Sequence, residues 1–258
     1  MKRKITFLIW ALFFLPGTAC FATSSILVWP IYQVIEADEN SSALWLENKG
    51  STSVGLQIRI MSWKQSDFRD RYAEQNNVIA TPPFMTLEPG KRNMIRLIRV
   101  TPTPANTERA YRIIIDEIAS PYQQDTPQMG LQFQMRYLLP LFLDGQGIWT
   151  HPRPEKQRAN AEPTLPVLSW RIGVEGGKNY LYVRNRGAVH ARLSNVYWSR
   201  DQAGQGNRTT LTDGFLGYVL PGQEMRWPLP AGLSMPGATM QLFTNLIGIT
   251  DPVLIKRE

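Results

Sequence analysis

The sequence predicts an all-β protein with two β-sandwich domains, the first of them immunoglobulin-like. Three observations carry this prediction. Short runs in which apolar and polar residues alternate recur along the chain, and this is the period of a β-strand. Turn-forming Pro, Gly, Asn and Asp residues separate the runs. No segment has the 3.6-residue period of an amphipathic helix, and about seven strands at this spacing are typical of an immunoglobulin-like sandwich.

The first 22 residues are predicted to be a secretory signal peptide. Residues 2–4 are basic, residues 5–15 form an apolar run, and residues 17–22 are mostly small. The apolar run is too short to span a membrane. We expect cleavage after Ala22, with Ala19 as the alternative, and removal of the segment from the mature chain.

The chain that remains after cleavage is cysteine-free and weakly basic. It has 236 of the 258 residues, and its net charge is +4, because the signal takes three of the 28 basic residues and none of the 21 acidic ones. The single cysteine, Cys20, follows Gly17-Thr18-Ala19 and leaves a lipoprotein signal as an alternative, although Leu is usual where Gly17 stands. An exported protein without disulfides must be held by its core alone. No later run of basic residues indicates nucleic acid as a partner.

The first domain, residues 23–148, reads as a series of strands in chain order. A polar, turn-like stretch at residues 64–77 interrupts the series. Pro82-Pro83 suits an irregular edge with room for a cis bond, and Pro89-Gly90 marks a turn. The strands are predicted at residues 25–29, 31–35, 43–47, 54–63, 78–87, 93–100 and 109–118.

The longest predicted strand is the last of this domain, between Gly130 and Gly145. Apolar Leu131, Phe133, Met135 and Tyr137 alternate with polar residues, and from residue 138 to 143 both faces are apolar. That end is therefore expected to be buried on both sides. A strand of roughly 13 residues exceeds the usual five or six. It either closes its own sandwich or offers its edge to another protein, and the residues alone favour the first.

The second domain is predicted at residues 167–258, after a proline-rich linker at residues 149–166. Its strands alternate as those of the first domain do. They are predicted at residues 167–173, 179–185, 190–198, 215–220, 224–229 and 238–245.

The chain lacks the residue constellations of an enzyme, so we predict no catalytic residue, no metal and no cofactor. His151 and His190 have no partner at a metal-ligand spacing. Asp116 and Glu117 are adjacent and point to opposite faces of a strand, which makes them poor acid/base partners. No serine lies in a G-x-S-x-G motif, and no glycine-rich phosphate loop is present.

Several local motifs together resemble the PapD-like periplasmic chaperones of the chaperone–usher pathway. The motif VIATPP at residues 78–83 is followed by LEPG at residues 87–90. The strand at residues 94–97 and the tyrosine-bearing strand at residues 109–118, which ends in Asp-Glu-Ile, match as well. Residues 43–48 and 60–63 are most similar to the archaic branch of that family. The resemblance covers nearly the whole mature chain, most strongly its first domain.

This resemblance implies a fold, partners and a mechanism. It implies two immunoglobulin-like β-sandwich domains in an L- or boomerang-shaped arrangement, located in the periplasm. It implies pilus subunits and an outer-membrane usher as partners. An exposed apolar strand would also favour self-association of the free chaperone. The chaperone would donate an edge strand to a subunit that lacks one. The donated side chains would be Leu131, Phe133, Met135 and Tyr137, each worth about 1.5–3 kcal/mol when buried.

The family commonly holds the C-terminal carboxylate of the subunit with two basic residues, and here the matching places are not basic. They fall near Tyr32-Gln33 and at Pro140. With the preceding loop centred near residues 124–125, Arg112 would lie across from residues 136–137. Arg112 and Arg136 are therefore predicted to form the carboxylate anchor. Arg59 and Arg96 are weaker candidates, and all of these arginines have the alternative of being ordinary solvated strand residues.

Two other classes of protein are alternatives: a secreted β-sandwich adhesin or surface-assembly structural component, and a secreted carbohydrate-active enzyme. A secreted β-sandwich adhesin would use the long strand to close its own fold, and its N-terminal donor strand would follow the signal, where Pro30 breaks the pattern. A carbohydrate-active enzyme would need paired carboxylates, which the sequence lacks.

Overall fold

The computed structural model describes residues 25–118, 134–150, 156 and 163–258, apart from 202, 205, 234 and 238. It contains seventeen strands, and no α-helix occurs in this described part of the chain. No helix that it describes is long and apolar enough to cross a membrane. The predicted signal peptide and its cleavage site lie outside the described residues.

Ten strands form the first unit, in which two sheets face each other. One sheet has the strand order β1-β3-β8-β6, and the other has the order β2-β10-β9-β4-β5, with β7 paired to β4. The strands are β1 (Ile26–Trp29), β2 (Gln33–Ile35), β3 (Ser41–Asn48), β4 (Val54–Ser66), β5 (Arg69–Ala73), β6 (Val78–Thr81), β7 (Phe84–Leu87), β8 (Arg92–Arg99), β9 (Glu108–Ile118) and β10 (Arg136–Asp144).

Seven strands form the second unit, in the order β14-β13-β16-β17-β11-β12-β15. They are β11 (Leu168–Glu175), β12 (Lys178–Asn185), β13 (Ala191–Ser199), β14 (Arg208–Val219), β15 (Glu224–Pro228), β16 (Gln241–Asn245) and β17 (Val253–Arg257). The predicted domain boundaries stay predictions, because most of the predicted linker lies outside the described residues.

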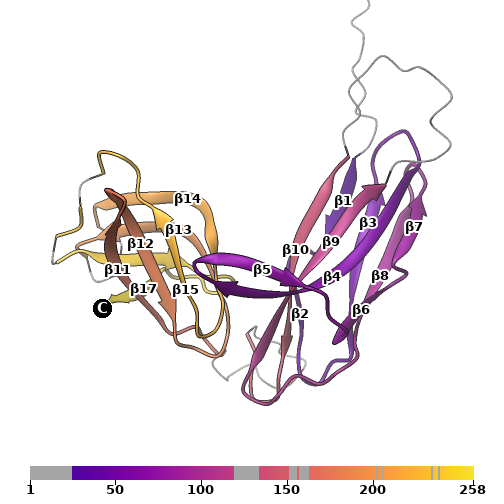
Figure 1. The fold of residues 1–258 in the computed structure, drawn as a ribbon, viewed down its shortest axis with the longest axis horizontal. Coiled ribbons are helices and arrows are strands. Elements are labelled where there is room, and N and C mark those ends of the chain that lie inside the picture. Colours follow the sequence, from indigo (N-terminus) through magenta and orange to yellow (C-terminus); the bar gives the residue numbers. More distant parts are fainter. Residues whose placement is uncertain are drawn as a thin grey trace, which may run out of the picture.

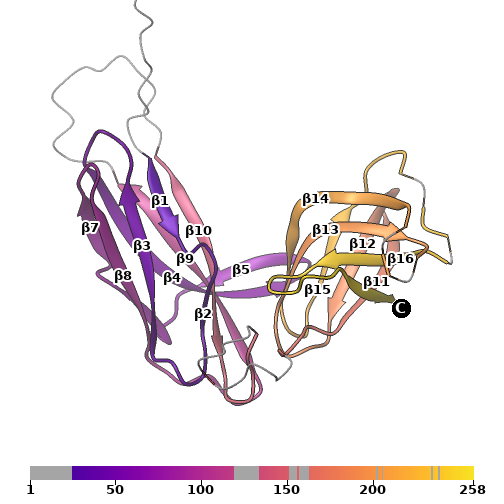
Figure 2. The same ribbon diagram turned by 180° about the vertical axis from the view of Figure 1, so that it is seen from behind.

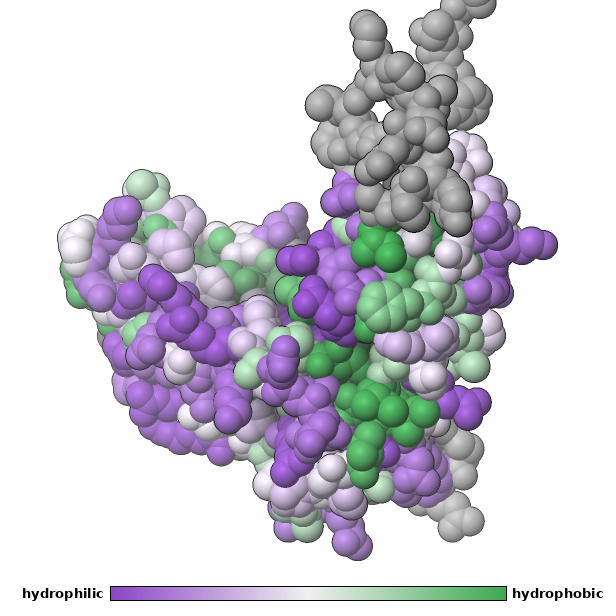
Figure 3. All heavy atoms as spheres, turned by 45° about the vertical axis from the view of Figure 1, so that its right-hand side comes forward, coloured by the Kyte–Doolittle hydropathy of each residue, from purple (hydrophilic) through white to green (hydrophobic). Residues whose placement is uncertain are grey.

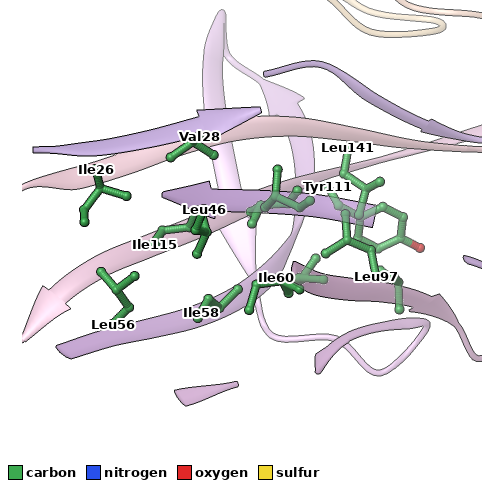
Figure 4. Packing of buried hydrophobic residues seen from close by; sticks show 14 of the residues in the cluster. Ile26, Val28, Leu46, Leu56, Ile58, Ile60, Leu97, Tyr111, Ile115 and Leu141 are labelled. Atoms are coloured by element: carbon green, nitrogen blue, oxygen red, sulfur yellow. The ribbon is translucent and has the colours of Figure 1, made fainter. Parts of the chain in front are cut away.

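The core of the first unit follows from the strand alternation. On β4, Leu56, Ile58 and Ile60 point inward and are at most 8 % exposed, whereas the residues between them face outward. Figure 4 shows these side chains meeting Leu46 of β3 and Ile115 of β9 between the two sheets. Burial of such side chains, at roughly 1.5–3 kcal/mol each, holds a chain that has no disulfide in its described part.

The two units form the arms of an open V (Figure 1), and the view from behind agrees (Figure 2). The expected L- or boomerang-shaped, all-β arrangement is therefore confirmed. The β4–β5 hairpin reaches from the first unit to the second (Figure 1), where the Gln65 side chain bonds the backbone of Tyr218 and Leu220 at 3.0 and 2.8 Å. The ring of Phe68, at the hairpin turn, meets Tyr182 edge-on at 5.5 Å.

Most predicted strands are present, and the expected cis bond is found at Thr81–Pro82. Two strands were missed. β5 lies within the stretch expected to be a polar turn region, and β17 follows the last predicted strand. β10 begins at Arg136, so the predicted length of roughly 13 residues is not reached within the described part.

Candidate functional site

Strand β10 has a partly open edge. On one side it pairs with β9 along its full length, from Arg136 opposite Asp116 to Asp144 opposite Glu108. On the other side β2 covers only residues 141–143. Residues 136–140 therefore have no strand on that side among the described residues. Unpaired N–H and C=O groups on such an edge are a template for a strand from another chain.

The two faces of β10 have different surroundings, and this explains its late apolar run. Leu141 and Leu143 face the sandwich core and are fully buried. Phe142 faces the second unit and is also fully buried. Burial on both sides is thus confirmed from Pro140 to Leu143. The prediction is wrong for Leu138, which is 43 % exposed because the second unit does not reach that far along the strand.

The structure places two of the four predicted donated residues, while Leu131 and Phe133 lie outside the described residues. Met135, just before β10, is 48 % exposed. Tyr137 is half-buried, packs at the margin of the core, and donates a hydrogen bond to Glu117 at 3.4 Å. Leu139 continues the same face beside the open edge and was missed, because the predicted series stopped at Tyr137.

The surface around this edge is apolar. Figure 3 brings forward the other side of the first unit, the one that carries β7 and β8 in Figure 1, and apolar side chains gather on that face as well. Four large apolar side chains are exposed near this edge: Met135 just before β10 at 48 %, Leu138 on β10 at 43 %, Leu27 on β1 at 48 %, and Ile31 between β1 and β2 at 66 %. Exposed apolar groups of this kind mark surfaces that other proteins cover.

The predicted register between the two anchor arginines is wrong. Arg112 lies opposite Pro140, and Arg136 lies opposite Asp116, four residues away along β9. The prediction assumed a loop centred near residues 124–125. The observed pairing places the partner of Arg112 three to four residues further along β10. The two arginines still share one face of the sheet, since the side-chain period of a strand is two.

Each predicted anchor arginine has partners of its own. Arg136 is 65 % exposed and its Nε donates to Asp116 Oδ1, while Arg59 Nη2 donates to Asp116 Oδ2 at 2.7 Å. Burial raises the pKa of Asp116, but the hydrogen bonds from Arg136 and Arg59 outweigh it and lower that pKa. Arg112 is only 7 % exposed, and its guanidinium lies 3.6 Å from the ring centre of Trp63 and 5.1 Å from that of Tyr218. Asp70 Oδ2 is 4.0 Å away.

An aromatic cluster joins the units at the base of the V. The ring of Phe142 stacks on His190 of the second unit, with centroids 3.4 Å apart. His190 Nδ1 contacts Glu108 Oε2 at 2.8 Å, and its Nε2 contacts the Tyr32 hydroxyl at 2.8 Å. Burial raises the pKa of Tyr32, so its hydroxyl keeps its proton. His151 lies outside the described residues. Within the described residues, no group of three or more His, Cys, Asp or Glu could hold a metal ion.

A buried carboxyl group lies beside this cluster. Asp144 is fully buried at the end of β10, and neither of its oxygens has a hydrogen-bond partner in the described structure. Burial, together with the charges of Glu108 and Glu36, raises the pKa of Asp144 to about 8, although Arg99 opposes the shift. The carboxyl group is therefore neutral in the folded chain at neutral pH.

This raised pKa predicts a pH-dependent stability. The folded chain holds a proton on Asp144 between pH 3.8 and about 8, whereas the unfolded chain releases it. The free energy of unfolding should therefore fall as the pH rises through this window, by up to about 1.4 kcal/mol per unit. Urea unfolding at several pH values would measure this. Asp144→Asn should flatten the dependence, and the exposed Asp251→Asn should leave it unchanged; a wild-type slope retained in Asp144→Asn would contradict the assignment.

Comparisons with known proteins agree with this geometry. Residues 31–148 match the family model of the pili and flagellar-assembly chaperones, PapD N-terminal domain. A probable fimbrial chaperone, LpfB of Escherichia coli O157:H7, is 26 % identical over 116 residues; the alignment covers 45 % of this chain and 47 % of that protein, so the chain spans about half the length of this curated relative.

Solved structures extend the similarity to the second unit. The crystal structure of the CsuC-CsuE chaperone–tip adhesion subunit pre-assembly complex, from the archaic Csu pili of Acinetobacter baumannii, matches with a TM-score of 0.71 and 31 % identity. This match covers 91 % of the present chain and 99 % of that one. The Salmonella enterica SafA pilin–SafB chaperone complex shares the fold, with a TM-score of 0.60 and 16 % identity over 90 % of this chain and 96 % of that one.

The family model covers the unit that carries the open edge, and the 31 % identity runs through both units. The chain therefore belongs to the PapD-like family of pilus-assembly chaperones.

Proposed function

We propose that this chaperone acts in the periplasm, where it binds pilus subunits by donating the edge of β10 and delivers them to an outer-membrane usher. The observation that carries the proposal is the open edge at residues 136–140, next to exposed apolar side chains. A subunit strand that pairs there would satisfy the unpaired backbone groups and cover the apolar surface. The signal peptide at residues 1–22 would direct the export.

The donated side chains would be those on the core-facing side of the strand. Leu131, Phe133, Met135 and Tyr137 are proposed as before, and the structure adds Leu139 because it has the same orientation beside the open edge. Main-chain hydrogen bonds would hold the subunit strand in register, while these side chains fill apolar sites in the subunit. No nucleotide or cofactor is needed, since the folding of the subunit supplies the free energy.

Co-expression tests the proposed function. The chain would be expressed with the small exported β-sandwich subunits of the same pilus, purified, and the composition of the complex determined by native mass spectrometry. A chaperone should be recovered with one subunit in equal amount. Recovery of the chain alone in every pairing would contradict the binding of subunits through β10. A homodimer that dissociates when a subunit binds would be consistent with an edge that is masked in the free chaperone.

The carboxylate anchor at Arg112 and Arg136 stays a proposal, and Arg136 is the residue that can be tested cleanly. Its exposed guanidinium shares Asp116 with Arg59, which leaves cationic hydrogen-bonding capacity at this point of the edge. Arg136→Glu should weaken subunit capture about tenfold or more, because it places an acidic group beside Asp116.

A matched control is Arg92→Glu. Arg92 is 58 % exposed and also pairs with a carboxylate, that of Glu47, but it lies on the other sheet. Capture would be compared by retention of the subunit on the immobilised chaperone. Equal retention by both variants and the wild type would remove Arg136 from the anchor. Arg112 is too deeply buried for a charge reversal to be read as a binding effect alone.

A further inference from the structure

The β1-β3-β8-β6 sheet, which does not contain β10, carries an apolar patch on its outer face. Figure 3 shows apolar side chains gathered on the side of the first unit that carries β8. Exposed apolar groups gathered in one place mark a surface that a partner covers. The residues of this outer patch are Val100 at 55 % exposure, Ile79 at 47 %, Trp45 and Met94 at 36 % each, and the half-buried Ile98.

Strand pairing brings these side chains together. One side of β8 is buried in the core, and Met94 and Ile98 lie on the opposite side. Trp45 of β3 lies opposite Met94, and Ile79 of β6 lies opposite Ile98. Val100, just after β8, donates its backbone N–H to the carbonyl of the residue that precedes β6, at 2.8 Å. The outer patch therefore crosses three neighbouring strands.

Arg96 places a cation in the middle of this patch. It is exposed, lies between Met94 and Ile98 on the outward side of β8, and has Ala43 and Thr81 as its cross-strand neighbours. In the part of the chain that the structure describes, no carboxylate lies within 4.0 Å of its guanidinium nitrogens. Arg96 is thus available to pair with an anion outside the chain.

The neighbouring charges make this face cationic. Arg92, the other outward arginine of β8, lies 4.7 Å from the ring centre of Trp29 and pairs with Glu47 at 3.2 Å. Glu47 also pairs with Lys49 at 2.5 Å, so two cations share one carboxylate. With Arg96 included, cations outnumber carboxylates among these residues. The partner of the outer patch is therefore expected to be negatively charged.

A lipid surface matches this face better than a protein does. A second copy docked about a two-fold axis would bring the two Arg96 side chains together without an acid between them. A different protein would have to bury a carboxylate opposite Arg96 within an apolar surface, which is costly. An anionic lipid layer offers phosphate throughout the headgroup region, with acyl chains beneath it. Tryptophan and arginine suit this boundary, because each combines an apolar body with a polar tip.

We propose that the outer patch binds the surface of a membrane that contains anionic phospholipids. Its apolar side chains enter the boundary between headgroups and acyl chains, the indole of Trp45 lies at the level of the headgroups, and Arg96 pairs with lipid phosphate. The contact is weak and reversible, because only a few apolar side chains and cations contribute. Since β10 belongs to the other sheet, a subunit and a membrane can be held at the same time.

Vesicle flotation with the chain purified after export tests this inference. The wild type should float with vesicles of phosphatidylcholine that contain about one quarter phosphatidylglycerol, and less so as the salt concentration rises. It should not float with vesicles of pure phosphatidylcholine. Arg96→Gln should weaken binding about fivefold, as expected for one basic residue at an anionic surface. Ile79→Ser/Met94→Ser should weaken it about tenfold or more, because apolar surface is lost.

Matched controls lie on the second unit. Arg200→Gln removes an exposed arginine, and Val174→Ser removes an apolar side chain of β11 that is 70 % exposed. Both should bind vesicles as the wild type does. Brominated acyl chains test the orientation, because they quench only tryptophans at the lipid surface. They should quench the wild type and have less effect on Trp45→Phe.

Two results would overturn the inference. One is a wild type that does not float with the anionic vesicles at low salt. The other is equal flotation by the wild type, Arg96→Gln and Ile79→Ser/Met94→Ser, and loss of a protein partner in these variants would then assign the face to that protein. Subunit capture through β10 should be unchanged in every variant, so membrane binding is tested independently of the proposed function.

Discussion

Replacing Met135 and Tyr137 together by glutamate is expected to abolish subunit capture while the chaperone stays folded. Both side chains lie on the face that we propose to be donated, and burying each is worth about 1.5–3 kcal/mol. Their loss, with two charges placed in apolar sites, should weaken capture by about a hundredfold to ten-thousandfold. Met135 is 48 % exposed and Tyr137 lies at the margin of the core, so the fold does not depend on them as it does on Leu141.

The measurement is the recovery of subunit with the tagged chaperone after co-expression. The control is Val174→Glu, because Val174 is an apolar residue of β11 with 70 % exposure, far from β10. Far-ultraviolet circular dichroism and thermal unfolding would confirm that the double variant is folded. Undiminished recovery of subunit by a folded Met135→Glu/Tyr137→Glu chaperone would refute donation of this face.

The strand alternation was sufficient to predict the sandwich, because it is a local property of the sequence. Leu56, Ile58 and Ile60 could be assigned to one face before any partner strand was known. Register is not local. Several turn-forming residues lie between β9 and β10, so the loop could be centred in more than one way, and the pairing of Arg112 was predicted three to four residues from where it lies.

β5 shows a different limit of sequence reasoning. All five of its residues are exposed, so it has no apolar alternation. It forms because β4 continues beyond the sandwich and turns back at Asp67 and Phe68, whose φ angles are +52° and +58°. Two-residue hairpins of this type usually carry Asn-Gly, and the pair Asp-Phe gives no comparable signal.

The candidate site was only partly predictable for the same reason. The apolar face of β10 could be identified from spacing, and so could its burial on two sides near Phe142. What covers Phe142 could not, because His190, Tyr218 and Trp63 come from strands far apart in sequence.

Removing Phe142 is expected to loosen the angle between the units without opening the donor edge. Phe142 is fully buried, stacks on His190, and packs 5.9 Å from Trp63. Truncation of a buried phenylalanine lowers the free energy of unfolding by about 3–5 kcal/mol. Here the lost contacts belong to both units, because Phe142 packs between them. Phe142→Ala should therefore lower the free energy of unfolding by about that amount and broaden the distance distribution in small-angle X-ray scattering.

The consequence for function separates this variant from substitutions on the donor face. Residues 136–140 keep their pairing with β9, so a folded Phe142→Ala chaperone should still capture subunit. Release should be faster, however, because the second unit would no longer be held against Phe142 of β10. Phe84→Ala, which truncates a phenylalanine that is 58 % exposed, should change neither scattering nor stability. If Phe142→Ala gave wild-type scattering and wild-type unfolding, the aromatic cluster could not be what fixes the V, and the hairpin contacts of Gln65 and Phe68 would have to hold it instead.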